Sequence, residues 1–442
     1  MTVWKDVRVN RMLWLVVATL ALGSLIGAGA GLLTLLLYGV EHVMLGYVEG
    51  AGAPGPFAVP AVRRAVSVTV GLSLAGLAWW LLRTKTTKVP SVKKAVAGER
   101  MPWWQTVVHV VLQIFIVGSG ASIGREVAPR ELGAMLAQRF CDLFHIGREG
   151  DAAGLADRRM VVAVAAGAGL GGVYDAPLAG MFFAVEILLA DVTLEKVGFA
   201  LGMSATAAYV ASLVKGRHTF YAVAGMTADY TPSLMLFALL CGVACGAAGA
   251  LFRKGSSWAT VHQPKGAMLL WQMPLAGLVT GLVAVFAPQV MGNGRAAAQL
   301  AFDGMAGSAG TVGSAQVWSL VGLLAVTFLV KAATTLATIR SGASGGVLQP
   351  GIALGATLGA TLGILWSFAF PGDPVGVCAL IGAAALLSAS QQAPLMAMCL
   401  VMELTEAPIT LFVPVGLAVA VSAVLSHRLL NGFLRPRGKT SI

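Results

Sequence analysis

The sequence predicts an all-α integral membrane protein built from two related halves, and three observations lead to this prediction. Hydrophobic residues make up 57% of the 442 residues, mean hydropathy is +0.82, and only 11% of residues are charged, against about 25% in a soluble domain. Apolar stretches follow one another along most of the chain, and motifs of its first half return in its second. A bilayer accommodates this much apolar surface, whereas water does not.

The apolar stretches indicate helices of uneven length. Several are shorter than the ~20 residues of a simple spanning helix, or are broken by Gly and Pro. Interrupted helices occur at membrane depth where they are buried in protein or line a cavity, which suggests a transport pathway. The first stretch is too long for a signal-peptide core and is expected to remain a helix. The stretches are 12–39, 60–82, 103–120, 160–171, 175–190, 194–214, 232–252, 268–290, 317–338, 352–370, 375–390 and 408–430.

The positive charge predicts how the chain is oriented. The net charge is +11, and the basic residues lie at the ends and in short connections. Basic residues that flank spans face the cytoplasm, so we expect a multi-pass protein of the cell inner (plasma) membrane with both termini cytoplasmic. Nucleic acid is not an expected partner. The basic residues are Lys5, Arg8, Arg11, Arg83, Lys85, Lys88, Lys93, Lys94, Arg428, Arg435, Arg437 and Lys439.

Other classes of function lack the residues that they need. The five cysteines have no zinc or disulfide spacing, and the six histidines form no metal or base motif, so no metal and no cofactor are expected. An intramembrane enzyme using Ser122 or Ser344 would have only Glu126 nearby. A cation transporter would need several buried acids, and a scaffold needs no broken helices. We therefore expect a protein that is not an enzyme.

The two halves are recognised by two matches in the same order. Ser119-Gly-Ala-Ser122 recurs as Ser341-Gly-Ala-Ser344 at an offset of 222, and Ala176-Pro-Leu178 recurs as Ala393-Pro-Leu395 at an offset of 217. The repeat predicts halves at about 12–220 and 230–430 within a single transmembrane domain covering 1–442. The spans do not decide whether the repeat is parallel or inverted. Two halves with broken helices indicate a binding site near the membrane midplane.

Glycine and proline mark candidate anion sites at helix starts. The stretch from Gly118 to Pro129 leads into a helical run, and Gly345-Gly-Val-Leu-Gln-Pro350 repeats this design. Proline favours the first turn of a helix, whose free N–H groups and partial positive charge suit an anion. Ala176-Pro177 and Ala393-Pro394 are expected to open two further helices.

Three glutamates of these motifs bear on the mechanism, and one of them breaks the symmetry of the repeat. Glu126 has Leu348 as its counterpart, whereas Glu186 and Glu403 correspond to each other. A carboxylate at a helix start can block the anion site when ionised and leave it when protonated; a salt bridge to Arg125 or a capping role is the alternative. Intramembrane carboxylates are costly and usually functional. The matched pair is expected to cap helices or bond between them.

These motifs resemble those of the chloride-channel (CLC) family of anion channels and anion/proton antiporters, in its prokaryotic form without regulatory domains. Gly124-Arg125-Glu126 looks like the start of the family's GREGP motif, Gly345-Gly-Val-Leu-Gln-Pro350 like GGIFAP, and Tyr174-Asp-Ala-Pro-Leu-Ala-Gly180 like NAPLAG. The stretch from Leu387 to Thr405 and Met291-Gly-Asn-Gly294 also match, so the resemblance covers residues from about 85 to 430.

The resemblance implies a CLC-like inverted repeat of many tilted and broken helices. It also implies a homodimer in which each subunit carries its own pathway for chloride or a similar monovalent anion, bound as the substrate ion. Glu126 would be the gate. The implied anion-binding residues are Thr87, Arg125, Glu126, Val127, Val347, Leu348 and Gln349.

Departures from the family pattern bear on the mechanism. Thr87 stands where the family usually has a serine, and the family's C-terminal tyrosine has no counterpart. Ile187 occupies the place of the second glutamate that antiporters carry on the inner proton route. We therefore expect a voltage- or pH-gated chloride channel. A proton-coupled chloride antiporter is the alternative, since Glu186 or a water chain could replace the missing carboxylate.

Overall fold

The computed structural model describes residues 11–50, 52–147, 152–227, 229–304 and 314–432, and within them the fold is helical. The described residues form no strand, only one isolated bridge between Gly124 and Gly346. The first group of helices is α2 (Gly23–Met44, continuous with η1, Ala18–Leu22), α3 (Ala61–Lys85), α4 (Val92–Val96), α5 (Trp103–Gly118), α6 (Val127–Leu143), α7 (Ala152–Tyr174), α8 (Pro177–Phe182), η2 (Phe183–Leu189) and α9 (Leu194–Lys215).

The second group of helices follows the first along the chain. It comprises α10 (Pro232–Val261), η3 (Gly266–Met268), α11 (Leu269–Phe286), η4 (Pro288–Val290), α12 (Arg295–Asp303), α13 (Ser314–Arg340), α14 (Leu348–Ser367), α15 (Val375–Gln391), α16 (Pro394–Thr405), η5 (Ile409–Leu411) and α17 (Phe412–Asn431). The expected helix starts hold, since Pro177 and Pro394 are the first residues of α8 and α16.

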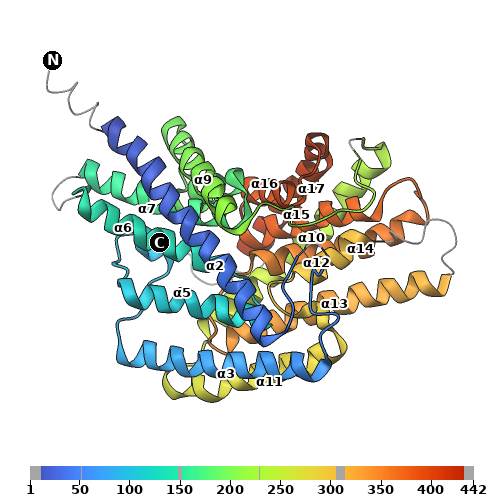
Figure 1. Cartoon of the computed structure of the whole chain (residues 1–442). Coiled ribbons are helices and arrows are strands. Elements are labelled where there is room, and N and C mark those ends of the chain that lie inside the picture. The colour runs from blue at the N-terminus through green and yellow to red at the C-terminus, as the bar shows by residue number, and fades with distance from the viewer. Residues whose placement is uncertain (1–10, 51, 148–151, 228, 305–313, 433–442) are drawn as a thin grey trace, which may run out of the picture.

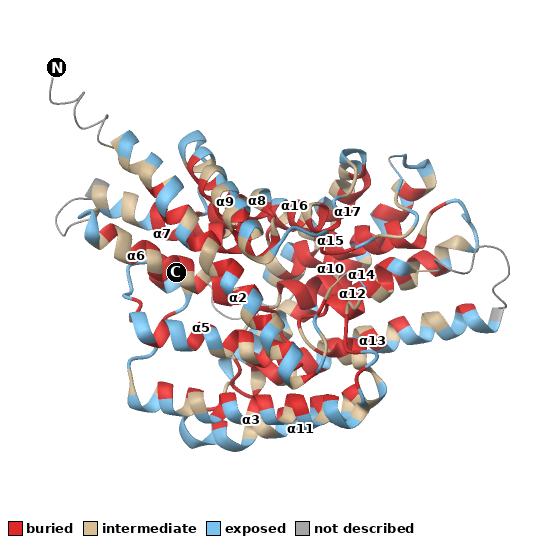
Figure 2. Cartoon of the chain, viewed as in Figure 1, coloured by how far each residue is buried: buried red, intermediate tan, exposed pale blue. Residues whose placement is uncertain are grey.

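Long helices surround shorter ones. In Figure 1, α3 and α11 lie side by side along the lower edge, where Gly277 and Gly281 of α11 touch the α3 backbone. The buried residues concentrate in α14 and α15 (Figure 2). Gly355 and Gly382 let the α14 and α15 backbones approach closely, because a Cβ at either would meet the other helix. The centre of the molecule is therefore made of small residues.

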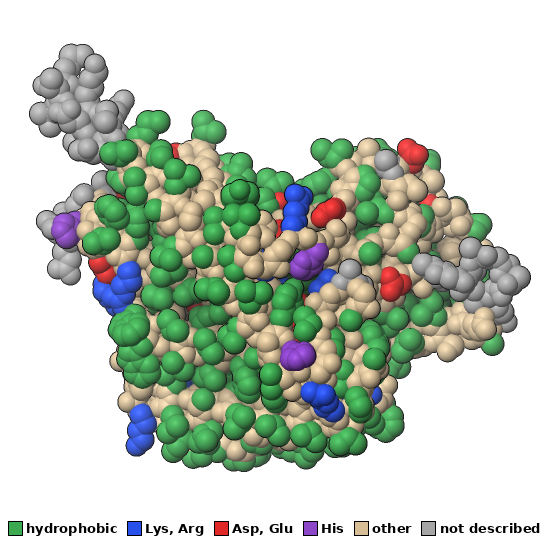
Figure 3. Space-filling model, in the orientation of Figure 1, with side chains coloured by type: hydrophobic (Ala, Val, Ile, Leu, Met, Phe, Trp, Pro, Cys, Tyr) green, Lys and Arg blue, Asp and Glu red, His purple; other side chains and the backbone are tan. Residues whose placement is uncertain are grey.

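The exterior is that of a multi-pass membrane protein. Eight helices among the described residues are long and apolar enough to cross a bilayer. Large hydrophobic side chains such as Leu32, Leu74 and Phe286 are exposed, and green apolar atoms dominate the face seen in Figure 3, with few charges. By contrast, α14 is the most enclosed of the candidate spans, with 78% of its apolar window buried. The prediction of an all-α membrane fold is confirmed.

Candidate functional site

The starts of α6 and α14 meet inside the protein. Gly124 and Gly346, which lie just before these helices, exchange both backbone hydrogen bonds, each with an N···O distance of 2.8 Å. Pro129 and Pro350 are each the third residue of their helix, as expected for the first turn. The two glycine-rich turns from distant parts of the sequence are thereby joined at one point.

Glu126 fills the space between these helix starts. Its side chain is completely buried, and its Oε1 accepts a hydrogen bond of 2.6 Å from the backbone N–H of Leu348 in α14. Its Oε2 is buried with no hydrogen-bond partner among the described residues. A helix N-terminus attracts negative charge, so the carboxylate occupies a place that suits a small anion.

Two glycines make room for this carboxylate. A Cβ at Gly346 would overlap Glu126 Oε1, and a Cβ at Gly124 would overlap Oε2. Neither glycine has a positive φ, so space rather than backbone conformation requires glycine there. The two glycines of these motifs are therefore explained by close approach of the backbone to the Glu126 carboxylate.

Arg125 is held by a buried polar cluster that the sequence did not reveal. Its guanidinium lies 5.6 Å from the ring centres of both Tyr174 and Phe220, and its Nη1 is 3.5 Å from Oε1 of Glu49. Arg295 Nη1 lies 3.9 Å from the same oxygen. Two arginines thus share one carboxylate, which leaves positive charge beside Glu126. The sequence signal was weak, because Glu49 lies outside every motif.

The other expected anion-binding residues divide into two places. Leu348 and Gln349 are buried at the α14 start, and Val127 and Val347 are half-buried beside them. Gln349 Oε1 accepts a 2.6 Å hydrogen bond from the Tyr221 hydroxyl, while its Nε2 has no partner among the described residues. A tyrosine hydroxyl therefore does reach the start of α14. It comes from Tyr221, which lies outside the motifs used in the sequence analysis.

Thr87 stands apart from this group. Its side chain is exposed and lines a cavity of about 600 Å³, which we call the Thr87 cavity. Ser344, three residues before Val347, also lines it, and Arg83 Nη2 donates a 2.9 Å hydrogen bond to the Ser344 hydroxyl. No hydrogen bond joins Thr87 to the Glu126 region in the described part of the chain.

Arg130 is a basic residue in the first turn of α6. Its Nε donates a 2.7 Å hydrogen bond to the Glu126 backbone oxygen, and its guanidinium lies 4.7 Å from the Phe183 ring centre. The side chain therefore adds positive charge one turn into α6 without bonding the Glu126 carboxylate.

Glu186 and Glu403 cap helices of the opposite half. Glu403 accepts hydrogen bonds of 2.8 Å from the backbone N–H groups of Leu178 and Ala179 at the start of α8. Glu186 accepts bonds of 3.2 and 2.9 Å from those of Leu395 and Met396 at the start of α16. Bonding between helices, as expected for this pair, is confirmed.

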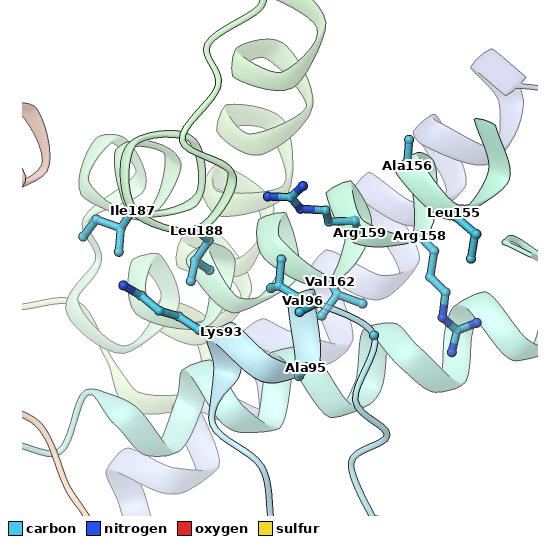
Figure 4. Close-up of a pocket in the computed structure, with 12 residues that line it drawn as sticks. Lys93, Ala95, Val96, Leu155, Ala156, Arg158, Arg159, Val162, Ile187 and Leu188 are labelled. Carbon is cyan, nitrogen blue, oxygen red and sulfur yellow. The ribbon is translucent and has the colours of Figure 1, made fainter. Parts of the chain in front are cut away.

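A second cavity, which we call the Ile187 cavity, is also lined in part by α4. It has a volume of about 660 Å³ and includes Lys93, Arg159 and Ile187 among its lining residues. In Figure 4, Lys93 and Ile187 lie at the same end and the Arg159 guanidinium extends toward Leu188. Lys94, the next residue of α4, lines the Thr87 cavity instead. The two cavities are therefore neighbours.

A third cavity approaches the site from the Arg125 side. It has a volume of about 240 Å³ and is lined by Tyr174, Asp175, His218, Phe220 and Glu403, among others. Tyr174 and Phe220 are the rings that contact Arg125. Within the described ranges, no group of three or more His, Cys, Asp or Glu side chains is placed to hold a metal ion.

The fold and site define a multi-pass membrane protein in which two buried helix starts meet at one carboxylate. A family model for voltage gated chloride channels matches residues 72–427. The chain belongs to this chloride-channel (CLC) family. A putative chloride channel protein ClcB-like of Ralstonia nicotianae is 30% identical over 425 residues, covering 92% of this chain and 93% of the relative. A voltage-gated ClC-type chloride channel ClcB of Salmonella dublin is 27% identical, covering 83% and 85%.

Solved structures share the fold. A slow cyanobacterial Cl-/H+ antiporter superposes with a TM-score of 0.74 at 21% identity, covering 94% of this chain and 95% of that chain. A CLC-type fluoride/proton antiporter gives a TM-score of 0.66 at 19% identity, covering 93% and 95%. The CLC-like helical architecture predicted from the motifs is thereby confirmed.

Proposed function

We propose that this protein exchanges chloride for protons across the cytoplasmic membrane, with Glu126 as the gate. The observation that carries the proposal is the hydrogen bond from the Leu348 N–H to the Glu126 carboxylate. An ionised carboxylate and a chloride ion compete for the same N–H. Protonation removes the charge that favours Glu126 there, so one group responds to both ions.

The sequence alone favoured a passive channel, because Ile187 replaces a carboxylate and a tyrosine is missing. The solved structures with this fold support the alternative, since a chloride/proton antiporter and a fluoride/proton antiporter share it. A second buried carboxylate, Glu131, also lines the Thr87 cavity and could serve a proton route. The channel remains the second candidate, supported by Ile187 and by the names of the curated relatives.

The proposed anion path uses backbone N–H groups more than side chains. The residues at the two helix starts, Arg125, Glu126 and Val127 against Val347, Leu348 and Gln349, would border the dehydrated ion. Thr87 would meet the anion in its cavity, where Arg83, Lys88, Lys94 and Lys265 concentrate anions through their positive charge.

We further propose that the Thr87 cavity faces the cytoplasm, as do both termini. The ends of α3 and α10, at Lys85 and Val261, adjoin this cavity, and basic residues surround it. The protein is proposed to be a homodimer that pairs through helices at 176–212 and 394–429, where Leu194, Tyr209 and Val413 are exposed. Crosslinking of dilute protein in mild detergent tests this, and a monomer under all conditions contradicts it.

One experiment separates exchange from passive flow. Purified protein in liposomes receives a chloride gradient with no proton gradient, the membrane potential is clamped, and external pH is recorded. An exchanger moves protons uphill, whereas a channel leaves pH unchanged. Cation flux without anion flux would contradict both candidates.

A further inference from the structure

The Thr87 cavity ends at a buried carboxylate on the gate helix. Glu131 lies in α6, five residues after Glu126, and is 6% exposed. It lines the cavity together with Arg83 and His109. The carboxylates of Glu186 and Glu403 are fully used by backbone N–H groups of the opposite half. Glu49 is shared by two arginines, whereas Glu131 lines a cavity.

The surroundings of Glu131 bond one of its two oxygens. Gln113 Nε2 donates a 2.6 Å hydrogen bond to Oε2, and His109 Nε2 lies 3.6 Å from the same atom. Trp79 Nε1, which can only donate, bonds His109 Nδ1 at 2.9 Å. Neutral His109 therefore carries its proton on Nε2, facing Glu131. No described residue donates a hydrogen bond to Oε1, which leaves that oxygen for a proton from the cavity.

The charges that face Glu131 are mainly positive. Arg83 stacks on Trp79 with 5.2 Å to the ring centre and lines the same cavity, as do Lys88, Lys94 and Lys265. Glu99, the other acid of this cavity, is 3.2 Å from Lys94. Arg130 neighbours Glu131 in sequence but bonds the Glu126 backbone. On the opposite face of α6, α7 packs through the backbone of Ala165 and Gly169, and its Arg158 bonds Asp142 near the far end of α6.

We propose that Glu131 is the proton acceptor between the Thr87 cavity and the gate, in place of the carboxylate missing at Ile187. A hydronium ion in the cavity gives its proton to Glu131 Oε1 and leaves as water. The new carboxyl O–H then releases this proton to water, which delivers it to the Glu126 carboxylate and restores ionised Glu131. Five residues of helix span about 7.5 Å, so transfer through water is required.

The neighbouring Ile187 cavity fits this role poorly. Among its lining residues are Lys93, Arg158 and Arg159, but no carboxylate or histidine, so it repels protons and offers no group to bind them. The Thr87 cavity has comparable positive charge, yet it ends at an acid and an imidazole on and beside the gate helix. The difference identifies which cavity can pass a proton to Glu126.

This inference rests on the proposed chloride/proton exchange, and the test separates the two. Glu131→Gln keeps the side-chain volume but cannot bind a proton. In liposomes with a chloride gradient and clamped potential, we expect the variant to lose at least about tenfold in uphill proton flux, with chloride flux retained. Glu131→Asp withdraws the carboxyl from the cavity and from Gln113, and should lower proton flux more than chloride flux. Glu403→Gln, which alters a capping acid, is the matched control and should keep the native flux ratio.

Each outcome decides one of the two claims. Uphill proton movement that is equal in the native protein and in Glu131→Gln overturns the role of Glu131 and leaves exchange standing. A native protein that carries chloride but moves no protons uphill overturns exchange itself, and the role of Glu131 with it. If Glu131→Gln does not fold, Glu131→Asp decides the question. An unchanged ratio of proton flux to chloride flux in that variant counts against the proposal, because it is the result expected of a purely structural acid.

Discussion

Two regions of this protein place glutamates at helix starts, and they do so differently. At the contact of α8 and α16, Glu186 and Glu403 each bond two successive backbone N–H groups of the opposite half. At the contact of α6 and α14, Glu126 bonds one N–H and buries its other oxygen without a partner. Leu348 stands where a reciprocal glutamate would be needed.

The difference shows how one interaction serves two purposes. A carboxylate that accepts hydrogen bonds with both oxygens at a helix start is held in place. If it left, two backbone N–H groups and its own charge would lose their hydrogen-bond partners. A carboxylate with a buried, unpartnered oxygen is less stable when ionised, so protonation or displacement by an anion relieves it. The asymmetric region is therefore the one that can switch.

The largest expected effect is at the asymmetric site. Lowering the pH protonates Glu126 and frees the Leu348 N–H, so anion flux through the native protein should rise as pH falls, by at most about tenfold per pH unit. Glu126→Gln imitates the protonated state and should remove most of this dependence while keeping anion flux. Radiotracer chloride uptake across a pH series measures it. A variant with the native pH profile would place the gate elsewhere.

The space around the gate gives the next prediction. Gly346→Ala adds a Cβ that overlaps Glu126 Oε1 without straining φ, so the carboxylate must leave its position. Anion flux at neutral pH should rise severalfold and depend less on pH, by the same chloride assay. Gly351→Ala, in the same helix, is the control, because it also adds a methyl group to α14 but does so away from Glu126. Its Cβ would meet Ser390 Oγ at 3.3 Å and Leu387 Cδ1 at 3.4 Å. Equal pH profiles in both variants would contradict the role of Gly346.

The reciprocal region should respond in stability and not in gating. Glu186→Gln and Glu403→Gln each replace a charged double acceptor by an amide that can accept at only one oxygen. Each should lower the free energy of unfolding by about 1–2 kcal/mol, to a similar extent in the two variants. Thermal unfolding in detergent measures this. A change in the pH profile of chloride flux with no loss of stability would show that these acids are not structural.

The sequence predicted the regions that depend on local chemistry. Pro129 and Pro350 mark first turns, and Pro177 and Pro394 mark first helical residues, because proline imposes its geometry on its own segment. The pairing of Glu186 with Glu403 followed from the repeat. Gly346 was noticed as part of a motif, but the reason for a glycine there, the Glu126 carboxylate from the other half, required the structure.

Contacts between distant segments could not be read in the same way. Glu49 joins Arg125 to Arg295, and Tyr221 bonds Gln349 across 128 positions; no spacing rule connects such residues. Glu131 was visible as an acid five positions after Glu126, yet its meaning depends on a cavity formed by the ends of α3 and α10. The sequence thus predicted Glu126 and the two helix starts around it, but not the buried polar groups beside them.

The smallest expected effect concerns Ile187, which adjoins the capping Glu186 and lines a basic cavity. Ile187→Glu alone should change proton flux by less than about twofold, since Lys93 and Arg159 hold the new carboxylate ionised and the native route already operates. In a Glu131→Gln background, the same change should restore little of the uphill proton flux, because a carboxylate that stays ionised does not pick up and release protons. Proton and chloride fluxes in liposomes measure both variants. A large gain in the single variant would show that the native chain lacks a working proton route, and would favour the channel.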